Sequence, residues 1–278
     1  MNLNVHPDNK LELDAAAAAR HQSVLLTSPP GFGMIESAEY LAHKLKAQIT
    51  HVRPVDRRTG AIDMANGKII VPLIRQLYES TRSKITSPQV VIIHASERMT
   101  ASAQNAFLKL LEEPRPNFHF VMLSEQLNLS LPTILSRVTI IHLRPITQAA
   151  SNDILDKLGV VDSKKRQQIM FMAAGLPHEL QALATDEQYF TKEAAIMADA
   201  KTMLTSDSYH RLLQAGSYRE DRDGAVELIN KALIITKLML KTNPSDQLVE
   251  QLGKLLSAKE QLQLNGNVRL SLMRGVLQ

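Results

Sequence analysis

Short apolar runs rich in β-branched residues recur in the first half of the chain. They are SVLLTS (23–28), VVIIHA (90–95), FHFVML (118–123) and VTIIHL (138–143). Between them lie three stretches with the helical period, Glu36 to Lys46, Val71 to Arg82 and Ala101 to Glu112. Because the runs are continuously apolar, we expect strands that are covered on both faces. Such strands alternating with helices predict a parallel sheet in an α/β domain.

The pattern changes after Pro145. Residues 147–190 predict two or three short helices punctuated by Gly175 and Pro177. From about residue 191 onward the apolar positions follow only the helical period, with interruptions near TNPSD and LNGN. The predicted fold class is therefore α/β followed by all-α. We expect three domains, namely an α/β domain (1–145), a small helical domain (146–190) and a larger helical domain (191–278).

Composition narrows the class of protein only in part. A chain of 278 residues with 44% hydrophobic content suggests two or three domains with their own cores. The absence of cysteine excludes disulfides and thiolate metal sites. Without a signal-like start or a run of 18 apolar residues, we expect a cytoplasmic protein with no membrane contact. The net charge of +4 fits work beside DNA, but with 4% aromatics and no tryptophan no base-stacking platform is visible.

The segment SPPGFGMI, between the first apolar run and the first helix, has the length of a phosphate-binding loop. The template for that loop is G-x-x-x-x-G-K-[ST]. Gly31 and Gly33 match glycines of the loop, whereas Ser28 stands in place of its first glycine. Met34 replaces the lysine that contacts the terminal phosphates, and Ile35 replaces the hydroxyl that ligates magnesium. On this segment alone, an ordinary strand, turn and helix is an equally good interpretation.

A second element of the same chemistry is also altered. In such nucleotide hydrolases a later strand ends in an aspartate for magnesium and a glutamate that orients water. Here His94 and Ala95 follow VVII, and Glu97 comes two residues later as a solvated residue at a helix start. We interpret His94 as a partly buried residue at the strand end, because no second ligand stands at metal-ligand spacing. The sequence thus predicts no ATP hydrolysis, no cofactor and no metal site.

Three motifs downstream of VVII are specific enough to indicate a family. They are Asn105-Ala106-Phe107-Leu108-Lys109, Leu111-Glu112-Glu113-Pro114 and Leu131-Pro132-Thr133-Ile134-Leu135-Ser136-Arg137. This stretch resembles the bacterial clamp-loader subunits of the AAA+ family. Among them, the motor subunits keep an intact phosphate loop, whereas the delta-prime kind commonly has a degenerate one. This chain resembles the delta-prime kind. The resemblance is strong over roughly residues 20–145 and weaker to the end, where LNGNVRLSLMRGVL is similar to the family's closing helix.

The resemblance implies an architecture and a set of partners. The architecture is an AAA+ P-loop-type parallel sheet domain, a small helical lid and a C-terminal helical collar that assembles with other subunits. The implied partners are ATP-binding motor subunits and the delta subunit of DNA polymerase III. The sliding clamp and primer-template DNA are met mainly through the assembled complex, during DNA replication. In this family the arginine at the position of Arg137, after Ser136, reaches the ATP of the neighbouring subunit, where a guanidinium can neutralise charge on the γ-phosphate.

Some positions depart from the family, and other interpretations stay open. Val138 replaces the family's cysteine, and THVRPVDRRTGAIDMANG carries none of the four cysteines that bind zinc in many relatives. His178 stands where the lid of motor subunits has an arginine, and Ser124 falls near the family's polar sensor. Arg137 could instead be a surface arginine paired with a nearby carboxylate. The chain could also be an active P-loop ATPase with an unusual loop, or a pseudo-AAA+ scaffold of another DNA-repair or recombination complex.

Overall fold

The computed structural model describes residues 4–80, 87–113 and 115–276, and the chain divides into two compact units. Unit 1 consists of Met1–Asp153 with Gly175–His178, and unit 2 consists of Ile154–Ala174 with Glu179–Gln278. Pro114 of the second motif and Arg82, the predicted end of one helix, lie outside the described residues. The finer division into three domains stays a prediction.

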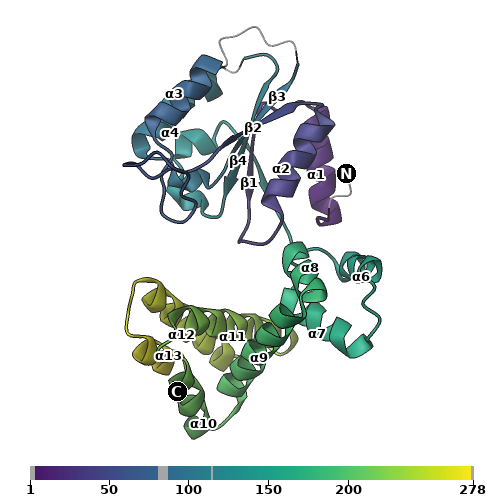
Figure 1. Cartoon of the computed structure of the whole chain (residues 1–278), viewed down its shortest axis with the longest axis vertical. Helices are drawn as coiled ribbons and strands as arrows, with labels where there is room; N and C mark the ends of the chain where they lie inside the picture. The colour runs from purple at the N-terminus through teal and green to yellow at the C-terminus, as the bar shows by residue number, and fades with distance from the viewer. Residues whose placement is uncertain (1–3, 81–86, 114, 277–278) are drawn as a thin grey trace. The chain divides into compact units, whose positions relative to one another are not determined.

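Unit 1 contains a five-stranded parallel sheet in the order β2-β3-β4-β1-β5 (Figure 1). The strands are β1 (Ser23–Thr27), β2 (Gln48–Val52), β3 (Gln89–Ile93), β4 (Phe118–Ser124) and β5 (Thr139–His142). Four of them coincide with the predicted apolar runs. Strand β2 was not predicted, and it forms an edge of the sheet with most of its residues exposed.

Helices cover both faces of this sheet (Figure 1). On one face lie α1 (Pro7–Ala18) and α2 (Met34–Lys44), and on the other lie α3 (Val71–Ser80), α4 (Ala101–Glu112) and α5 (Pro132–Leu135). Successive residues of β1 point to opposite faces of the sheet. Val24 and Leu26 therefore belong to the core under α1 and α2, and Leu25 belongs to the core under α3, α4 and α5. Burial on both faces explains why these strands are continuously apolar, as predicted.

The stretch between β2 and α3 is held by short-range contacts and by small bridges. Val55 pairs with Ile62 and with Lys68, and the Asp56 carboxylate accepts hydrogen bonds from the backbone N–H groups of Arg58 and Thr59. Two short 3₁₀ turns, η1 (Ser96–Arg98) and η2 (Leu127–Leu129), follow β3 and β4.

Unit 2 is helical. Its helices are the end of α6 (Gln148–Lys157), α7 (Ser163–Ala173), α8 (Pro177–Thr185, from Glu179), α9 (Glu187–Thr205), α10 (Ser208–Ser217), α11 (Arg222–Thr242), α12 (Asp246–Gln263) and α13 (Val268–Val276). The breaks after α11 and α12 fall at the predicted TNPSD and LNGN interruptions. Helix α9 runs without a break through residue 190, where a domain boundary is predicted. No helix in the described part of the chain is both long and apolar enough to span a membrane.

A buried ion pair joins the helices of unit 2. Lys231 of α11 lies 2.5 Å from Glu193 of α9, and their side chains are only 10% and 4% exposed. Glu179 of α8 lies 3.7 Å from the same ammonium group and accepts a hydrogen bond from the Tyr189 hydroxyl. Three helices therefore meet at one set of charges.

Candidate functional site

The degenerate phosphate loop follows β1 and ends where α2 begins. Gly31 and Gly33 have φ angles of +89° and +76°, which side chains other than glycine rarely adopt. The Gly33 carbonyl oxygen accepts hydrogen bonds from both the amide and the hydroxyl of Ser37, which fixes the first turn of α2. Ser28 is buried, and its hydroxyl oxygen has no partner among the described residues. The loop thus keeps the shape of strand, turn and helix that its sequence predicts.

The two substituted positions of the loop carry no phosphate-binding chemistry. Met34 is half-buried and packs against the core on the α1 and α2 face of the sheet. Ile35 is 42% exposed and offers only carbon atoms. A lysine ammonium and a magnesium-ligating hydroxyl are what these positions supply in an intact loop.

The residues Gly175–His178 lie against this loop and belong to the same unit. A Cβ atom on Gly31 would be 3.4 Å from Leu176, and one on Gly33 would be 3.4 Å from the Glu36 carboxylate. His178 Nε2 lies 2.9 Å from that carboxylate. A helix N-terminus attracts anions, and here Glu36 in the first turn of α2 already places a negative charge there. A phosphate would therefore meet a carboxylate and a leucine side chain.

His94 and Ala95 occupy the carboxyl end of β3. His94 is 5% exposed, and its Nε2 lies 2.9 Å from Nδ1 of His51. Burial, then the neighbouring His51 and the charge of Arg53, lower the pKa of His94 to about 4. The imidazole is thus neutral near pH 7, and Ala95, in a left-handed conformation, contributes no ligand. In the described residues no group of three or more His, Cys, Asp or Glu side chains could hold a metal ion.

Glu97 differs from the solvated residue that the sequence predicts. It is half-buried in η1, and one of its carboxylate oxygens is buried with no hydrogen-bond partner in the described residues. Burial, together with the nearby charge of Glu97, raises the pKa of Glu125, which follows β4. Ser124, at the sensor position, is fully buried and its hydroxyl accepts a hydrogen bond from the Gln126 amide. Sequence pattern gave no signal for the proximity of the two glutamates.

Arg137 lies between α5 and β5 and is held by local contacts. Its Nη1 donates to the Thr133 carbonyl oxygen at 3.0 Å and to the Ser136 hydroxyl at 3.3 Å. Its Nη2 lies 3.0 Å from Glu112 at the end of α4, and the two side chains are 38% and 49% exposed. In the isolated chain Arg137 is thus paired with a carboxylate, while a third or more of its side chain remains accessible.

Packing against α4 positions the segment that carries Arg137. Gln104 is buried in α4, and its side-chain oxygen accepts a hydrogen bond from the amide of Leu131, just before α5. Phe107 is fully buried and meets Phe120 of β4 edge to face, with ring centroids 5.2 Å apart. These contacts explain why a side-chain amide stands at position 104 and a large apolar ring at position 107.

The loop and Arg137 lie at opposite edges of the sheet. Strands β1 and β5 are parallel neighbours, with Val24 paired to Thr139. Ser28 directly follows β1 at the carboxyl edge, whereas Arg137 precedes β5 at the amino edge. Five residues of strand separate the two edges by roughly 16 Å. The structure therefore brings Ser136 and Arg137 together, but it does not bring them to the loop of their own chain.

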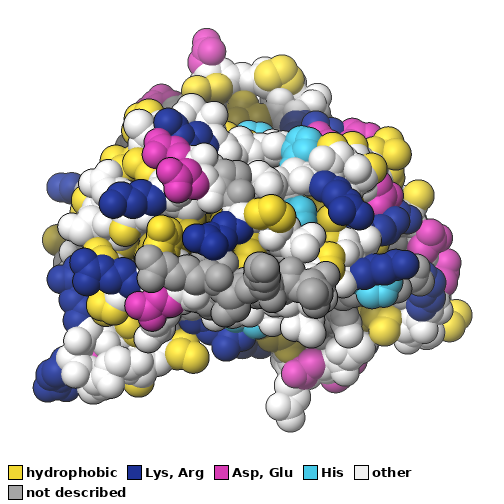
Figure 2. Space-filling model, turned by 90° about the horizontal axis from the view of Figure 1, so that it is seen from above, with side chains coloured by type: hydrophobic (Ala, Val, Ile, Leu, Met, Phe, Trp, Pro, Cys, Tyr) yellow, Lys and Arg dark blue, Asp and Glu magenta, His cyan; other side chains and the backbone are white. Residues whose placement is uncertain are grey.

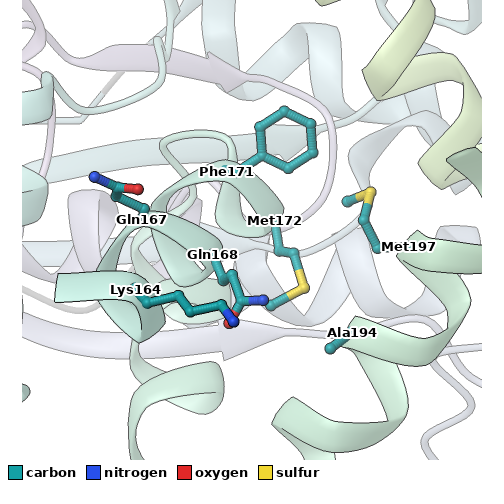
Figure 3. A pocket seen from close by; sticks show the side chains of 7 residues that line it. All are labelled: Lys164, Gln167, Gln168, Phe171, Met172, Ala194 and Met197. Atoms are coloured by element: carbon teal, nitrogen blue, oxygen red, sulfur yellow. The ribbon is translucent and has the colours of Figure 1, made fainter. Parts of the chain in front are cut away.

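The charged side chains seen in Figure 2 do not single out a nucleic-acid interface. On the part of that face made by described residues, Lys and Arg are spread among acidic and apolar side chains. A hollow of about 350 Å³ in unit 2 lies between α7 and α9 (Figure 3). Its lining is largely apolar, with Phe171, Met172 and Met197, and Lys164 is the charged residue among the described residues that line it. Neither the charged side chains of Figure 2 nor the hollow between α7 and α9 was part of the site that the sequence predicts.

Comparisons with known proteins support the resemblance that the motifs predict. The model of a family described as "DNA polymerase III, delta subunit" matches residues 49–147. DNA polymerase III subunit delta′ of Haemophilus influenzae is 26% identical over 189 residues, which are 62% of this chain and 57% of that protein. The delta′ subunit of Bacillus subtilis is 37% identical over 67 residues, 24% of this chain and 20% of that protein. The matched parts span less than two thirds of either relative.

A solved structure has a similar fold over nearly the whole chain. The crystal structure of a DNA polymerase III gamma subunit-related protein from Thermotoga maritima superimposes with a TM-score of 0.54, at 19% identity, covering 97% of both chains. Together with the parallel sheet and the helical second unit, this likeness confirms the predicted fold class, α/β followed by all-α.

Proposed function

We propose that this chain, which is similar to delta-prime subunits of the bacterial clamp loader, is a non-hydrolysing subunit of that assembly. In this proposal it joins ATP-binding motor subunits and the delta subunit in the cytoplasm. The complex loads the sliding clamp onto primer-template DNA for DNA polymerase III. The subunit supplies Arg137 in trans to the ATP of a neighbour.

One observation carries the proposal: the accessible arginine and the altered loop lie at opposite edges of one sheet. An arginine at the amino edge is roughly 16 Å from the loop of its own chain, too far for direct contact with a phosphate there. The same arginine is available to a site that another subunit presents to this edge. The geometry thus favours action in trans over action within the chain.

The ion pair of Arg137 with Glu112 is compatible with this role. Exposed ion pairs contribute about 0–1 kcal/mol, so a nucleotide phosphate can displace Glu112 at small cost. Charge-assisted hydrogen bonds from a guanidinium to phosphate oxygens are stronger than neutral ones. The contacts to Thr133 and Ser136 hold the side chain near one orientation before a neighbour arrives.

The absence of hydrolysis by this chain is inferred from the loop. Its lysine and hydroxyl positions are Met34 and Ile35, and Glu36 places a carboxylate at the helix N-terminus. His94 is uncharged near neutral pH where a magnesium-binding aspartate is expected. We therefore expect no calorimetric signal when ATP and magnesium are added to the purified chain. A dissociation constant near the micromolar range would contradict this part of the proposal.

The trans role is tested in the reconstituted assembly. The wild-type chain, Arg137→Ala and Arg144→Ala are each purified with the motor and delta subunits, and DNA-stimulated ATP hydrolysis is measured. Arg144 is a matched control because it is an ion-paired arginine, 49% exposed, that follows β5 at the opposite edge. Removing an arginine finger lowers the rate of hydrolysis at its site by about 10³-fold or more. The total rate of the assembly should therefore fall by the fraction that this one ATP site contributes.

The two variants separate the possible outcomes. The assembly with Arg137→Ala should form normally and hydrolyse ATP more slowly. The assembly with Arg144→Ala should form normally and hydrolyse ATP at the wild-type rate. If Arg137→Ala assembles and keeps the wild-type rate, Arg137 is not a finger. If it fails to assemble, its role is structural and the proposed chemistry is wrong.

A further inference from the structure

A hollow of about 330 Å³ lies at the amino edge of the sheet in unit 1, away from the loop. Its lining comes from residues just before the strands: Arg20 precedes β1, Lys46 precedes β2, and Asn117 precedes β4. The ends of α1 and α2 form its other wall. Residues far apart in sequence thus converge here because parallel strands all begin at one edge.

Positive charge dominates this hollow. The side chains of Arg20 and Lys46 are exposed and make no hydrogen bond or ion pair with the described residues. Lys44 also lines the hollow, but it lies 2.8 Å from Asp14, and that contact is the main cause of the lowered pKa of Asp14. Among the described lining residues there is no carboxylate. Two cations are therefore left without a counter-charge.

A buried histidine adds a directional group. His119 is 7% exposed, and its Nδ1 lies 2.9 Å from the carbonyl oxygen of His21. Because a carbonyl oxygen only accepts, Nδ1 carries the hydrogen, and in the neutral ring Nε2 is then an acceptor. His119 lines the hollow, and Nε2 has no partner in the described part of the chain. Nε2 is therefore available to accept a hydrogen from a ligand in the hollow.

The backbone at the two cations is unfavourable for their residue types. Arg20 and Lys46 have φ angles of +49° and +53°. Each follows the C-cap residue of a helix, and the next amide bonds back into the last turn; this position usually holds glycine. A cation also offsets the helix dipole, but α2 already has His43 and Lys44 in its last turn. Strained residues that persist suggest a function for the side chain.

We propose that this hollow binds inorganic phosphate through Arg20, Lys46 and His119. Hydrogen phosphate carries two negative charges, which match the two unpaired cations. Its one P–OH group donates to His119 Nε2, while its other oxygens accept from the guanidinium and the ammonium. Sulfate has the same charge but no hydroxyl, and a phosphodiester has one charge and no hydroxyl. The site therefore discriminates between anions by hydrogen bonding as well as by charge.

Titration of the full-length chain with sodium phosphate at pH 7.5 and low salt tests the site. Backbone amide resonances of Arg20, Lys46 and His119 should shift and saturate. Arg20→Gln and Lys46→Gln should each weaken phosphate binding by about fivefold or more, as expected for one lost charge-assisted hydrogen bond. Lys241→Gln is the matched control, because Lys241 is an exposed lysine near the end of α11, and it should leave the affinity unchanged.

The identity of the anion is tested in the same way. Sulfate should bind more weakly than phosphate to the wild type, and His119→Phe, which has no acceptor, should remove that preference. Equal binding of the two anions by the wild type would show a nonspecific basic surface and overturn the proposal. Tighter binding of a short unphosphorylated single-stranded oligonucleotide than of phosphate would also overturn it, in favour of nucleic acid.

Glycine substitutions separate loss of the ligand from loss of the fold. Arg20→Gly and Lys46→Gly relieve the left-handed strain, so both variants should unfold at a higher temperature than the wild type. Both should nevertheless bind phosphate at least about fivefold more weakly. Glycine variants that keep wild-type affinity, or a wild type with no saturable shifts, would refute the site.

Discussion

The protonation of His94 can be followed from the structure to a measurable pH dependence. Its pKa is lowered to about 4 by burial first, and then by His51 and Arg53. In the unfolded chain a histidine has its ordinary pKa of about 6.5. Between these values the unfolded state binds a proton that the folded state does not bind. The stability that the neutral imidazole contributes is therefore complete above pH 6.5 and is lost as the pH falls to 4.

The size of this effect follows from the difference between the two pKa values. The pKa of His94 is about 4 in the folded chain and about 6.5 in the unfolded chain, and at about 1.36 kcal/mol for each tenfold change in proton affinity this difference gives up to about 3 kcal/mol. The variant His94→Gln keeps a hydrogen-bonding side chain toward His51 and does not titrate. Wild type should thus lose up to about 3 kcal/mol more than the variant between pH 7.5 and pH 4. The raised pKa of Glu125 acts with the opposite sign, but it is present in both proteins and largely cancels.

Two measurements check this prediction independently. Urea unfolding of wild type and His94→Gln at pH 7.5, 6, 5 and 4 gives the difference in free energy of unfolding. A nuclear magnetic resonance titration of the His94 ring gives its pKa directly. The reasoning is wrong if the ring titrates near pH 6.5, or if the free-energy difference between the two proteins stays constant over this range.

Two further substitutions test packing. Lys231→Met leaves Glu193 buried without its partner, which should reduce the free energy of unfolding by about 3–5 kcal/mol. The double variant Lys231→Met with Glu193→Leu should recover most of this loss, because no charge is then buried. A loss below about 1 kcal/mol in urea unfolding would show that the pair is solvated. Gly175→Ala would place a Cβ 2.7 Å from that of Pro145 at φ +81°, so we expect a loss of about 2–4 kcal/mol. Gly159→Ala, at φ +72° with no atom within 4 Å, should lose only about 1 kcal/mol, and equal losses would exclude the clash.

The sheet shows which elements hydrophobic pattern can predict. Strands β1, β3, β4 and β5 are recognisable because their residues are apolar on both faces. Strand β2 is QITHV at the edge of the sheet, where solvent tolerates polar residues, and its sequence therefore lacks the continuous run. Helix α1 was also missed, because only Asn9, Leu13 and Ala16 are buried and they give almost no periodic contrast.

The sequence predicted which chemical groups stand at the positions of the candidate site, but not which of these groups contact one another. The loss of a lysine at Met34 and the presence of Arg137 are visible in the sequence. The contact between Glu36 and His178 joins residues far apart in the chain, and no local pattern indicates it. Likewise, the sequence left open that Arg137 pairs with a nearby carboxylate. Only the folded structure, in which the end of α4 lies beside the residue after α5, identifies that carboxylate as Glu112.

The separation of the loop and Arg137 along β1 and β5 has a consequence for how such a chain can change over generations. Substitutions at one end of a strand leave the packing at its other end intact, because the strand between them is anchored by its own core contacts. A lineage can therefore erase the residues beside Gly33 without altering the surface around Ser136. The two ends of the strands can therefore be substituted independently of each other.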